Sequence, residues 1–298
     1  MSSTLVQAGH PFARSVRNVL GVFKLRIGVM IMITALAGLA VTPGEPLTLV
    51  QWLVLALSVL LSSASAGAFN QYYEYESDRL MARTRARAFV TGELAHTPIW
   101  LGVMAALLFG SVWATWTVIN AMSALFVFLG AFFYAVVYTV WLKRRTSLNI
   151  VIGGLAGSFA VLAGAAAADP QLGPLPLLLA LVLFLWTPPH FWSLAIANQP
   201  DYAAAGIPML PVVVGPQRAA HIVLGSTLAL VLASLVPAWF GAGPVYIGGA
   251  LIGGTYFLFK AWRLSRTPCR ATALGSFFAS LVQLSLLLAA ASIDGVIR

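Results

Sequence analysis

The stretch from Asn70 to Val90, NQYYEYESDRLMARTRARAFV, interrupts a chain that is otherwise almost entirely apolar. Three of the eight acidic residues of the protein fall within five positions of it, at Glu74, Glu76 and Asp78, and four arginines follow. Of the 298 residues, 60% are hydrophobic and 8% are charged. A soluble domain carries about 25% charged residues. Lipid must therefore surround most of this chain, and the quoted stretch marks a place where the chain leaves it.

The apolar runs on both sides of this stretch predict membrane spans, because a transmembrane helix needs about 20 mostly apolar residues. Nine stretches qualify, at 24–42, 49–69, 97–117, 120–141, 149–168, 173–193, 218–239, 244–262 and 272–292. They predict an all-α, polytopic membrane protein, with residues 1–23 as a cytoplasmic N-terminal segment and residues 24–298 as a single intramembrane domain. The gaps near Asn120 and at Gly241–Gly243 leave open whether two helices or one kinked helix lie there.

The basic residues give an independent test of the span count, because Lys and Arg collect on cytoplasmic loops. With the N-terminus inside, sixteen of the 17 Lys and Arg residues fall on inside segments, and only Arg298 falls outside. We therefore expect a cytoplasmic N-terminus and an external C-terminus, in the inner or plasma membrane of a bacterial cell. The net charge of +9 then reflects topology, and no nucleic-acid partner is needed to explain it.

Asn70, Glu74 and Asp78 are spaced four residues apart in the charged stretch. On a helix, successive members turn by about 40° and rise by ~6 Å, so they form one stripe if the second span continues beyond the membrane surface. Two carboxylates and an amide oxygen suit Mg²⁺, which takes oxygen ligands and is usually shared with substrate phosphates. The alternative is a solvated interfacial loop in which Glu and Arg side chains pair with each other.

A second unusual segment, FLWTPPHFWSLAIANQPDYAAAGIPMLPVVVG, runs from Phe184 to Gly215. Its Pro188-Pro189 pair predicts a break or kink near the inner end of the sixth span. His190 lies among aromatic residues and is either structural or part of a pocket for a flat ligand. Asp201 is the only acid in its loop, so it is the natural additional carboxylate if a cation site exists.

These segments together resemble the protoheme IX farnesyltransferases (heme O synthases), a branch of the UbiA-type intramembrane prenyltransferases. NQYYEYESDRLMART resembles the family's first acidic motif, Asn-x-x-x-Asp/Glu-x-x-x-Asp followed by Met-x-Arg-Thr. LKRRTSLNIVIGG and WTPPHFW…DYAAAGIPMLPVVVG resemble two further signatures of this branch. The similarity runs from about Lys24 through the ninth span. The chain departs from the pattern where Ala88, and not proline, follows Arg87, and where Asp201 stands alone instead of in an Asp-x-x-x-Asp pair.

The resemblance implies a nine-helix bundle around a central cavity, and transfer of the farnesyl group of farnesyl diphosphate to a vinyl group of heme B, which gives heme O. Mg²⁺ is the implied cofactor, heme B is a substrate, and a heme A synthase or terminal oxidase is the expected recipient of the product. The residues that the resemblance assigns are Asn70, Glu74, Asp78 and Asp201 for the metal, Arg83, Arg87, Lys143 and Arg144 for diphosphate or a heme propionate, and His190 for heme.

Two other functions stay open at this point. One is prenyl transfer to a quinone precursor by a member of the same superfamily, against which the segment DYAAAGIPMLP argues. The other is a small membrane transporter. A transporter is expected to carry polar or charged groups at the middle of its spans, whereas here these groups gather near the cytoplasmic edge.

Overall fold

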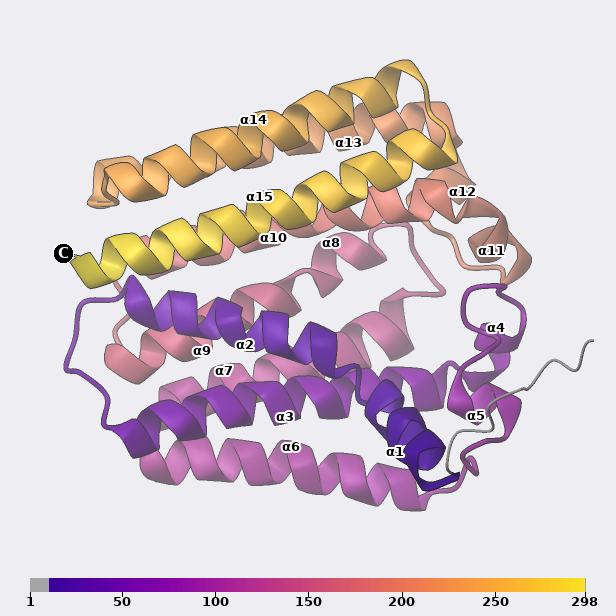
Figure 1. Cartoon of the computed structure of the whole chain (residues 1–298), viewed down its shortest axis with the longest axis horizontal. Helices are drawn as coiled ribbons and strands as arrows, with labels where there is room; N and C mark the ends of the chain where they lie inside the picture. The colour runs from indigo at the N-terminus through magenta and orange to yellow at the C-terminus, as the bar shows by residue number, and fades with distance from the viewer. Residues whose placement is uncertain (1–10, 298) are drawn as a thin grey trace, which may run out of the picture.

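The computed structural model describes residues 11–297, and these fold into a bundle of helices that contains no β-strand in this range (Figure 1). The long helices are α2 (Leu25–Ala40), α3 (Leu49–Tyr73), α6 (Ile99–Val118), α7 (Ala121–Phe132) with its continuation η1 (Phe133–Leu142), α9 (Leu155–Ala168), α10 (Pro174–Ala197), α13 (Pro216–Ala233), α14 (Pro244–Arg266) and α15 (Arg270–Ile297). The short ones are α1 (Pro11–Val22), α4 (Tyr75–Arg79), α5 (Ala88–Thr91), α8 (Asn149–Gly153), α11 (Gln199–Ala204), α12 (Leu210–Val214) and η2 (Val236–Phe240). Residues 1–10 of the predicted cytoplasmic segment and Arg298 lie outside the described range.

The long helices run side by side and close into a ring. In sequence order, α3 packs on α6, α7 on α9, α10 on α13, and α14 on both α13 and α15. The ring closes where α15 packs against α2 and α10 packs against α9. Because α2 also packs along α9, the first and last long helices tie the two halves of the chain together.

The all-α, membrane-embedded class is confirmed, whereas the count of nine spans is supported only in part. Seven helical stretches in residues 11–297 are long and apolar enough to cross a membrane, or eight if α1 and α2, which meet at 47°, form one span. The predicted spans 24–42 and 244–262 are the two outside the seven. The helix α2 has only 16 residues, and in α14 glycines, tyrosines and terminal basic residues dilute the apolar ones.

Both ambiguous gaps separate two helices. Asn120 has an extended backbone and accepts a hydrogen bond from the Ser123 amide at 2.8 Å, so it caps α7. The helices α6 and α7 then lie against each other as a hairpin. Gly241 has a φ of 99°, a left-handed conformation that favours glycine, and it ends η2 before α14 begins.

Glycines allow α2 and α9 to touch backbone to backbone. A Cβ atom added to Gly164 would lie 1.7 Å from the carbonyl oxygen of Ala35, and one added to Gly38 would lie 2.2 Å from that of Val161. Small residues permit such close approach where lipid supplies no hydrophobic driving force between helices. This contact holds α2 closely against α9 in the bundle.

The sequence predicts a break or a kink at Pro188-Pro189, and the break is wrong, because α10 continues from Pro174 to Ala197 through both prolines. Prolines inside a membrane helix are tolerated when neighbouring helices and Ser or Thr side chains satisfy the freed backbone groups. Here α10 packs against α9, α13 and α15. His190 is therefore presented from a continuous helix.

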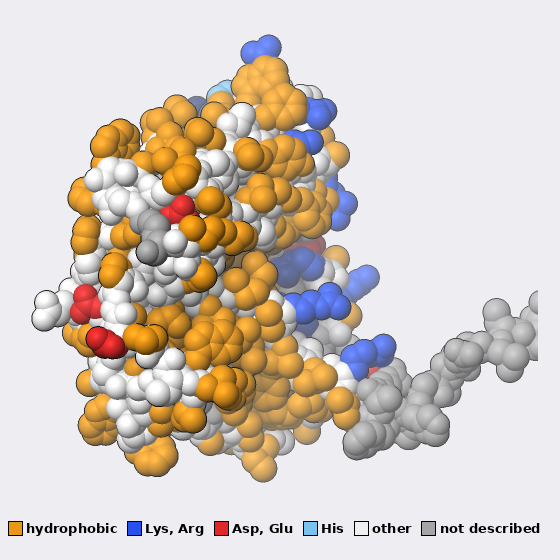
Figure 2. All heavy atoms as spheres, turned by 60° about the vertical axis from the view of Figure 1, so that its left-hand side comes forward, with side chains coloured by type: hydrophobic (Ala, Val, Ile, Leu, Met, Phe, Trp, Pro, Cys, Tyr) orange, Lys and Arg blue, Asp and Glu red, His pale blue; other side chains and the backbone are white. Residues whose placement is uncertain are grey.

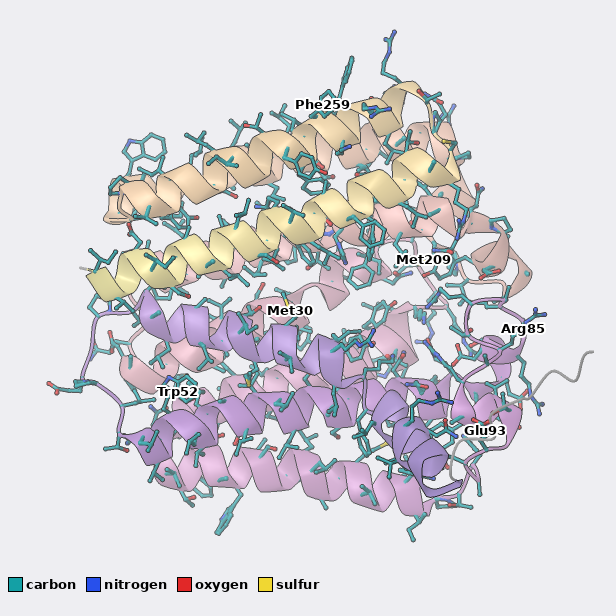
Figure 3. The ribbon with its side chains drawn as sticks, viewed as in Figure 1. Met30, Trp52, Arg85, Glu93, Met209 and Phe259 are labelled. Carbon is teal, nitrogen blue, oxygen red and sulfur yellow. The ribbon has the colours of Figure 1, made fainter. Side chains whose placement is uncertain are left out.

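Charge is concentrated at one end of the bundle. Figure 2 shows a broad apolar surface, with Lys and Arg side chains gathered along its right-hand edge. The short helices α4, α5, α11 and α12 lie at that end in Figure 1, and Arg85 and Glu93 mark it in Figure 3, whereas Met30 and Trp52 lie along the apolar helices. We call this end, which carries residues 74–91, 143–146 and 198–209, the charged end.

Candidate active site

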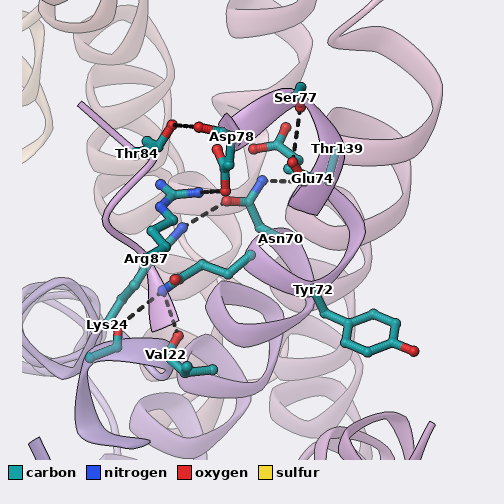
Figure 4. A network of polar contacts seen from close by, with 12 residues as sticks. Val22, Lys24, Asn70, Tyr72, Glu74, Ser77, Asp78, Thr84, Arg87 and Thr139 are labelled. Atoms are coloured by element: carbon teal, nitrogen blue, oxygen red, sulfur yellow. Dashed lines mark hydrogen bonds and ion pairs between the residues drawn. The ribbon is translucent and has the colours of Figure 1, made fainter. Parts of the chain in front are cut away.

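The acidic stripe is built where α3 gives way to α4. The helix α3 ends at Tyr73, Glu74 forms the joint and α4 begins at Tyr75. The Glu74 amide nevertheless donates to the Asn70 carbonyl oxygen at 3.0 Å, and the Asp78 amide to that of Glu74 at 2.9 Å. Four-residue hydrogen bonding therefore links Asn70, Glu74 and Asp78 through the joint, and their side chains enter one polar network (Figure 4).

Each carboxylate of the stripe is paired with a cation from a distant segment. Glu74 forms an ion pair with Lys143, which follows η1, and Asp78 forms one with Arg87, which precedes α5. Glu74 and Asp78 are 2% and 0% exposed, and Lys143 is 8% exposed. A buried charge is tolerated only when it is paired and hydrogen-bonded, so these pairs hold the loops of the charged end against α3.

The two carboxyl groups differ in how well they are stabilised. Burial opposes ionisation of Glu74, but Lys143 and its hydrogen bond, together with Lys24 and Arg87, outweigh it, so the pKa of Glu74 lies below its usual value. Burial raises the pKa of Asp78 above its usual value, although Arg87 opposes this. The Oδ1 atom of Asp78 is buried and has no hydrogen-bond partner in residues 11–297. A further cation near Asp78 would therefore stabilise its ionised carboxylate more than that of Glu74.

Asn70 is held from both ends of its amide. The Lys24 ammonium donates to Asn70 Oδ1 at 2.7 Å, and Asn70 Nδ2 donates to the Thr139 hydroxyl at 3.2 Å. Lys24 sits between α1 and α2 with a φ of 49°. Gln71 fixes the end of α1 by donating to the carbonyl oxygens of Gly21 and Val22, at 2.9 and 3.0 Å.

Lys24 and Thr139 are site residues that sequence reasoning missed. Lys24 served there only as a topological charge, and Thr139 looks like an ordinary residue of an apolar span. Their partner Asn70 is 46 and 69 residues away in sequence, respectively. The only local signal is a lysine placed directly before an apolar run, and topology explains that equally well.

The other two predicted anion-binding residues, Arg144 and Arg83, lie in different surroundings. Arg144 reaches the site, because its guanidinium donates to the Ser77 hydroxyl at 3.1 Å. The Arg83 side chain is exposed, and its backbone amide is the group with a defined contact. That amide and the amide of Ala82 donate to the two carboxylate oxygens of Asp201, at 3.2 and 3.3 Å. Asp201 therefore ties α11 to the loop that leads to Arg87.

The donor set for a metal is smaller than the sequence suggests. In residues 11–297, no group of three or more His, Cys, Asp or Glu side chains converges on one point, so Asp201 does not join Glu74 and Asp78 as a third carboxylate. Asn70 Oδ1, Glu74 and Asp78 remain as hard oxygen donors, and one Asp78 oxygen is unpartnered. Such donors fit a hard divalent cation, provided that Lys24, Lys143 and Arg87 move to another anion.

His190 belongs to a separate polar seam between α10 and α15. Its ring is stacked between Trp186 and Phe277, with ring centroids 4.1 and 4.6 Å away. Its Nδ1 lies 2.6 Å from the Ser280 hydroxyl oxygen, and that hydroxyl donates to the Phe277 carbonyl oxygen at 2.6 Å. Since the single hydroxyl proton is already used, Nδ1 must be the donor. The Nε2 atom of His190 then carries a free lone pair, as a metal ligand requires.

Comparisons with known proteins show which sequences this chain resembles. The profile of the UbiA prenyltransferase family matches residues 31–286. A protein named protoheme IX farnesyltransferase 2, from Paramagnetospirillum magneticum, is 58% identical over 92% of this chain and 95% of its own length. Protoheme IX farnesyltransferase 1 of the same organism is 45% identical over 93% of this chain and 98% of its own length.

Solved structures show the same fold at low sequence identity. A UbiA homolog from Archaeoglobus fulgidus, determined with DMAPP and Mg²⁺ bound, has a TM-score of 0.73 and 17% identity, and covers 93% of this chain and 99% of its own. At this identity the likeness concerns the fold alone. The helical architecture is therefore one that membrane proteins of this family share.

Proposed function

The chain belongs to the UbiA prenyltransferase family, in its protoheme IX farnesyltransferase branch, and on that premise we propose that it transfers the farnesyl group of farnesyl diphosphate to a vinyl group of heme B, which gives heme O. Membership of this family makes the chain an enzyme, and the transporter alternative is not retained. The observation that carries the substrate assignment is the 58% identity to a named farnesyltransferase over 92% of the chain.

The charged end supplies a binding site for the diphosphate group. Three basic side chains, Lys24, Lys143 and Arg87, lie around Asn70 and the carboxylates of Glu74 and Asp78. In this buried setting, electrostatic attraction for a diphosphate oxygen is stronger than in water. We propose that these three cations exchange their present oxygen partners for diphosphate oxygens, with Arg144 contributing from the neighbouring loop. Arg83 is too exposed to be a principal ligand.

The oxygens that these cations release would hold Mg²⁺. Asn70 Oδ1, Glu74 and Asp78 are the proposed ligands, and Asp78 brings an oxygen that is otherwise unpartnered. When bound, Mg²⁺ stabilises the negative charge that develops on the leaving diphosphate. The solved structure of the Archaeoglobus fulgidus homolog, whose bound ligands are DMAPP and Mg²⁺, supports this assignment by fold. We assign Asp201 the role of holding the loop that carries Arg87, by way of its two amide hydrogen bonds.

The proposed reaction needs no protein nucleophile. The bond between C1 of the farnesyl group and the diphosphate oxygen breaks, and the electron pair leaves with diphosphate. The π electrons of the heme vinyl group then form a carbon–carbon bond to C1. Water adds to the cation that remains on the former vinyl group and loses a proton, which gives the hydroxyethylfarnesyl side chain. Buried, preorganised cations favour the first step because they are already aimed at the developing charge.

Heme B requires a second binding region, and the seam around His190 is its proposed location. The Trp186 and Phe277 rings on both sides of the imidazole fix its orientation, and the hydrogen bond with Ser280 leaves Nε2 as the atom that contacts heme. An imidazole whose other nitrogen is held by a hydrogen bond is typical of metal-ligating histidines.

The membrane arrangement completes the proposal. We propose nine spans around a central cavity, with residues 24–298 as one intramembrane domain, the charged end and residues 1–23 in the cytoplasm, and the C-terminus outside. The distribution of basic side chains along one edge of the molecule supports this orientation (Figure 2). We further propose the bacterial inner or plasma membrane as the location, with a heme A synthase or terminal oxidase as recipient of the product.

The test is product identification with the purified, full-length protein in detergent, supplied with farnesyl diphosphate, heme B and Mg²⁺. We expect a heme whose mass equals that of heme B plus one farnesyl group and one hydroxyl group. The variant Glu74→Gln should form none of it, whereas Glu45→Gln, at an exposed acid of the opposite end, should match the parent protein. A parallel reaction replaces heme B by a hydroxybenzoate. Prenylation of the hydroxybenzoate, with none of heme B, would show that the quinone-precursor alternative is correct.

A further inference from the structure

The end of α3 and the helix η1 meet in matched register. Asn70 contacts Thr139 at 3.2 Å, and Glu74 pairs with Lys143, so two residues four apart on one segment face two residues four apart on the other. Lys143 continues the five-residue hydrogen bonding of η1, since its amide donates to the Tyr138 carbonyl oxygen at 2.9 Å. Such π-helical segments are rare and are frequently found at functional sites.

The hydrogen bonds of Thr139 have only one possible direction. A hydroxyl group carries one proton and two lone pairs. The Thr139 hydroxyl lies 2.8 Å from the Tyr134 carbonyl oxygen, which can only accept, so the single proton is used there. Towards Asn70 the hydroxyl can therefore only accept, and it must face the amide nitrogen of Asn70.

The opposite side of Asn70 imposes the same orientation. The Lys24 ammonium, which can only donate, lies 2.7 Å from Asn70 Oδ1. Asn70 and Thr139 are 3% and 1% exposed, so bulk water does not compete for these bonds. These hydrogen bonds run from Asn70 through the Thr139 hydroxyl to the Tyr134 carbonyl oxygen, which is a fixed acceptor. They direct Asn70 Oδ1 towards the Lys24 side chain.

We propose that Thr139 is a positioning residue that holds the Asn70 amide with its oxygen towards the catalytic metal. The proposal rests on the proposed function, in which Asn70 Oδ1 binds a divalent cation. The two ends of an amide differ in charge, because the oxygen attracts a cation and the NH₂ group repels it. Without the Thr139 hydroxyl, nothing on that side distinguishes the two orientations, and a rotated Asn70 presents the wrong end to the metal.

The test measures metal binding directly on the purified, full-length protein. The protein is dialysed to equilibrium against a solution of Mn²⁺ and inorganic diphosphate, and the excess Mn²⁺ on the protein side, measured over a range of concentrations, gives the affinity. Thr139→Val, which keeps the shape and removes the acceptor, should weaken Mn²⁺ binding by about 10- to 100-fold, the usual effect of removing a group that orients a metal ligand. Thr139→Ser should bind as the parent protein does.

Two controls separate orientation from general packing. Thr227 is a matched control, because it is 0% exposed and its hydroxyl bonds to its own helix at 2.8 Å away from the site, so Thr227→Val should leave Mn²⁺ binding unchanged. Asn70→Asp is the second control, since a carboxylate presents an acceptor oxygen in either orientation. In the Asn70→Asp background, Thr139→Val should have little further effect, even if it lowers the stability of the fold.

The results distinguish a wrong positioning role for Thr139 from a wrong metal site. If the parent protein binds Mn²⁺ and Asn70→Ala weakens that binding while Thr139→Val does not, the positioning role is wrong and the metal site stands. An equal loss on Thr139→Val in the Asn70 and Asn70→Asp backgrounds also overturns the positioning role, because orientation cannot then be the cause. If Asn70→Ala and Asp78→Asn leave Mn²⁺ binding unchanged, the proposed metal site is itself wrong, and the role of Thr139 falls with it.

Discussion

Lys143 is the residue that keeps Glu74 ionised, although both side chains are buried. Burial raises the pKa of Glu74, but Lys143, with help from Lys24 and Arg87, lowers it by more, so the pKa lies below its usual value. The ionised carboxylate is therefore present above this lowered pKa and is lost as the pH falls through it. Metal binding also requires the carboxylate of Asp78, whose pKa burial raises. As the pH falls, activity should therefore decline first through Asp78, and protonation of Glu74 should add a second loss at lower pH.

We predict that Lys143→Met moves the loss of activity caused by protonation of Glu74 to higher pH. Burial raises the pKa of Glu74, and without Lys143 less opposes this effect. The measurement is the pH profile of kcat/KM for farnesyl diphosphate. Lys260→Met is the matched control, because Lys260 lies on α14 over the Tyr256 ring and takes no part in the site. If the acid side of the pH profile is the same in Lys143→Met as in the parent protein, whatever the overall rate, the pairing of Lys143 with Glu74 is contradicted.

Asp201 is predicted to act through the backbone and not through the metal. Asp201→Asn keeps one acceptor oxygen for the amides of Ala82 and Arg83 and removes the charge. We expect activity within about 10-fold of the parent protein, since a hydrogen bond to a charged group contributes about 1.5–3 kcal/mol and one bond remains. The Mg²⁺ concentration for half-maximal rate should be unchanged.

A direct metal ligand gives a different result in the same experiment. Loss of activity that excess Mg²⁺ restores would place Asp201 in the metal site. Trypsin cleavage after Arg83 or Arg85 gives a second readout, because a loosened loop is cut faster. Asp201→Ala should increase this cleavage more than Asp201→Asn does.

Single residues also show how far sequence reasoning reaches. The spacing of Asn70, Glu74 and Asp78 is local, and the four-residue hydrogen bonds of the structure preserve it. The partners of these residues are not local. Lys24 and Thr139 come to Asn70 from segments 46 and 69 residues away, and only the packing of α2 and η1 against α3 brings them there.

Among the elements, η1 is the one whose geometry the site depends on most. Phe133–Leu142 looks like ordinary apolar helix in sequence, because four- and five-residue hydrogen bonding cannot be told apart from apolar composition. In the structure it is π-helical, and it sets Thr139 and Lys143 opposite Asn70 and Glu74. The helix was predictable and its register was not.

We predict that deleting Val136 from η1 abolishes activity without preventing membrane insertion. Removing one residue changes the rotation of the following side chains relative to α7, so that Thr139 and Lys143 no longer face their partners together. Heme O formation should fall by at least about 100-fold, which corresponds to about 2.7 kcal/mol of transition-state stabilisation. Deletion of Gln171, in the turn between α9 and α10 at the opposite end, is the control. Normal activity after the Val136 deletion would mean that the register of η1 is unimportant.

The other differences between expectation and structure also lie at the scale of elements. The helix α1 was expected only as part of a cytoplasmic segment, yet it meets α2 at 47° and the pair could form one span. The helix α10 passes through two prolines, because contacts with α9, α13 and α15 hold a helix that proline alone would weaken. In α10, packing therefore overrides the local propensity of proline.

For the whole molecule, the class of fold follows from composition, since so few charged residues leave no other solvent than lipid. The all-helical bundle was predictable for this reason, as was the concentration of charge at one end. The number of spans was less certain, because α2 is short and α14 is rich in glycine. How the helices pack into a ring depends on contacts such as Gly38 and Gly164, which the sequence does not reveal.

The single cysteine offers a direct test of orientation. Cys269 is exposed between α14 and α15, and hydrogen bonds with Thr272 lower the pKa of its thiol, which favours reaction with maleimides. We predict that a membrane-impermeant maleimide labels Cys269 in inverted membrane vesicles and not in intact spheroplasts. The double variant Cys269→Ser with Glu45→Cys should show the reverse pattern. Labelling of Cys269 from outside would contradict the proposed orientation.

The central claim is that a divalent cation at the charged end, held by Asn70, Glu74 and Asp78, enables diphosphate to leave the farnesyl group. Its most direct test is the rate of heme O formation by purified protein, with farnesyl diphosphate and heme B, before and after a chelator removes divalent ions. A chelator already saturated with Mg²⁺ serves as the control. The proposed function predicts that the rate falls by at least about 100-fold and returns on addition of excess Mg²⁺, and an unchanged rate in the ion-free protein would contradict it.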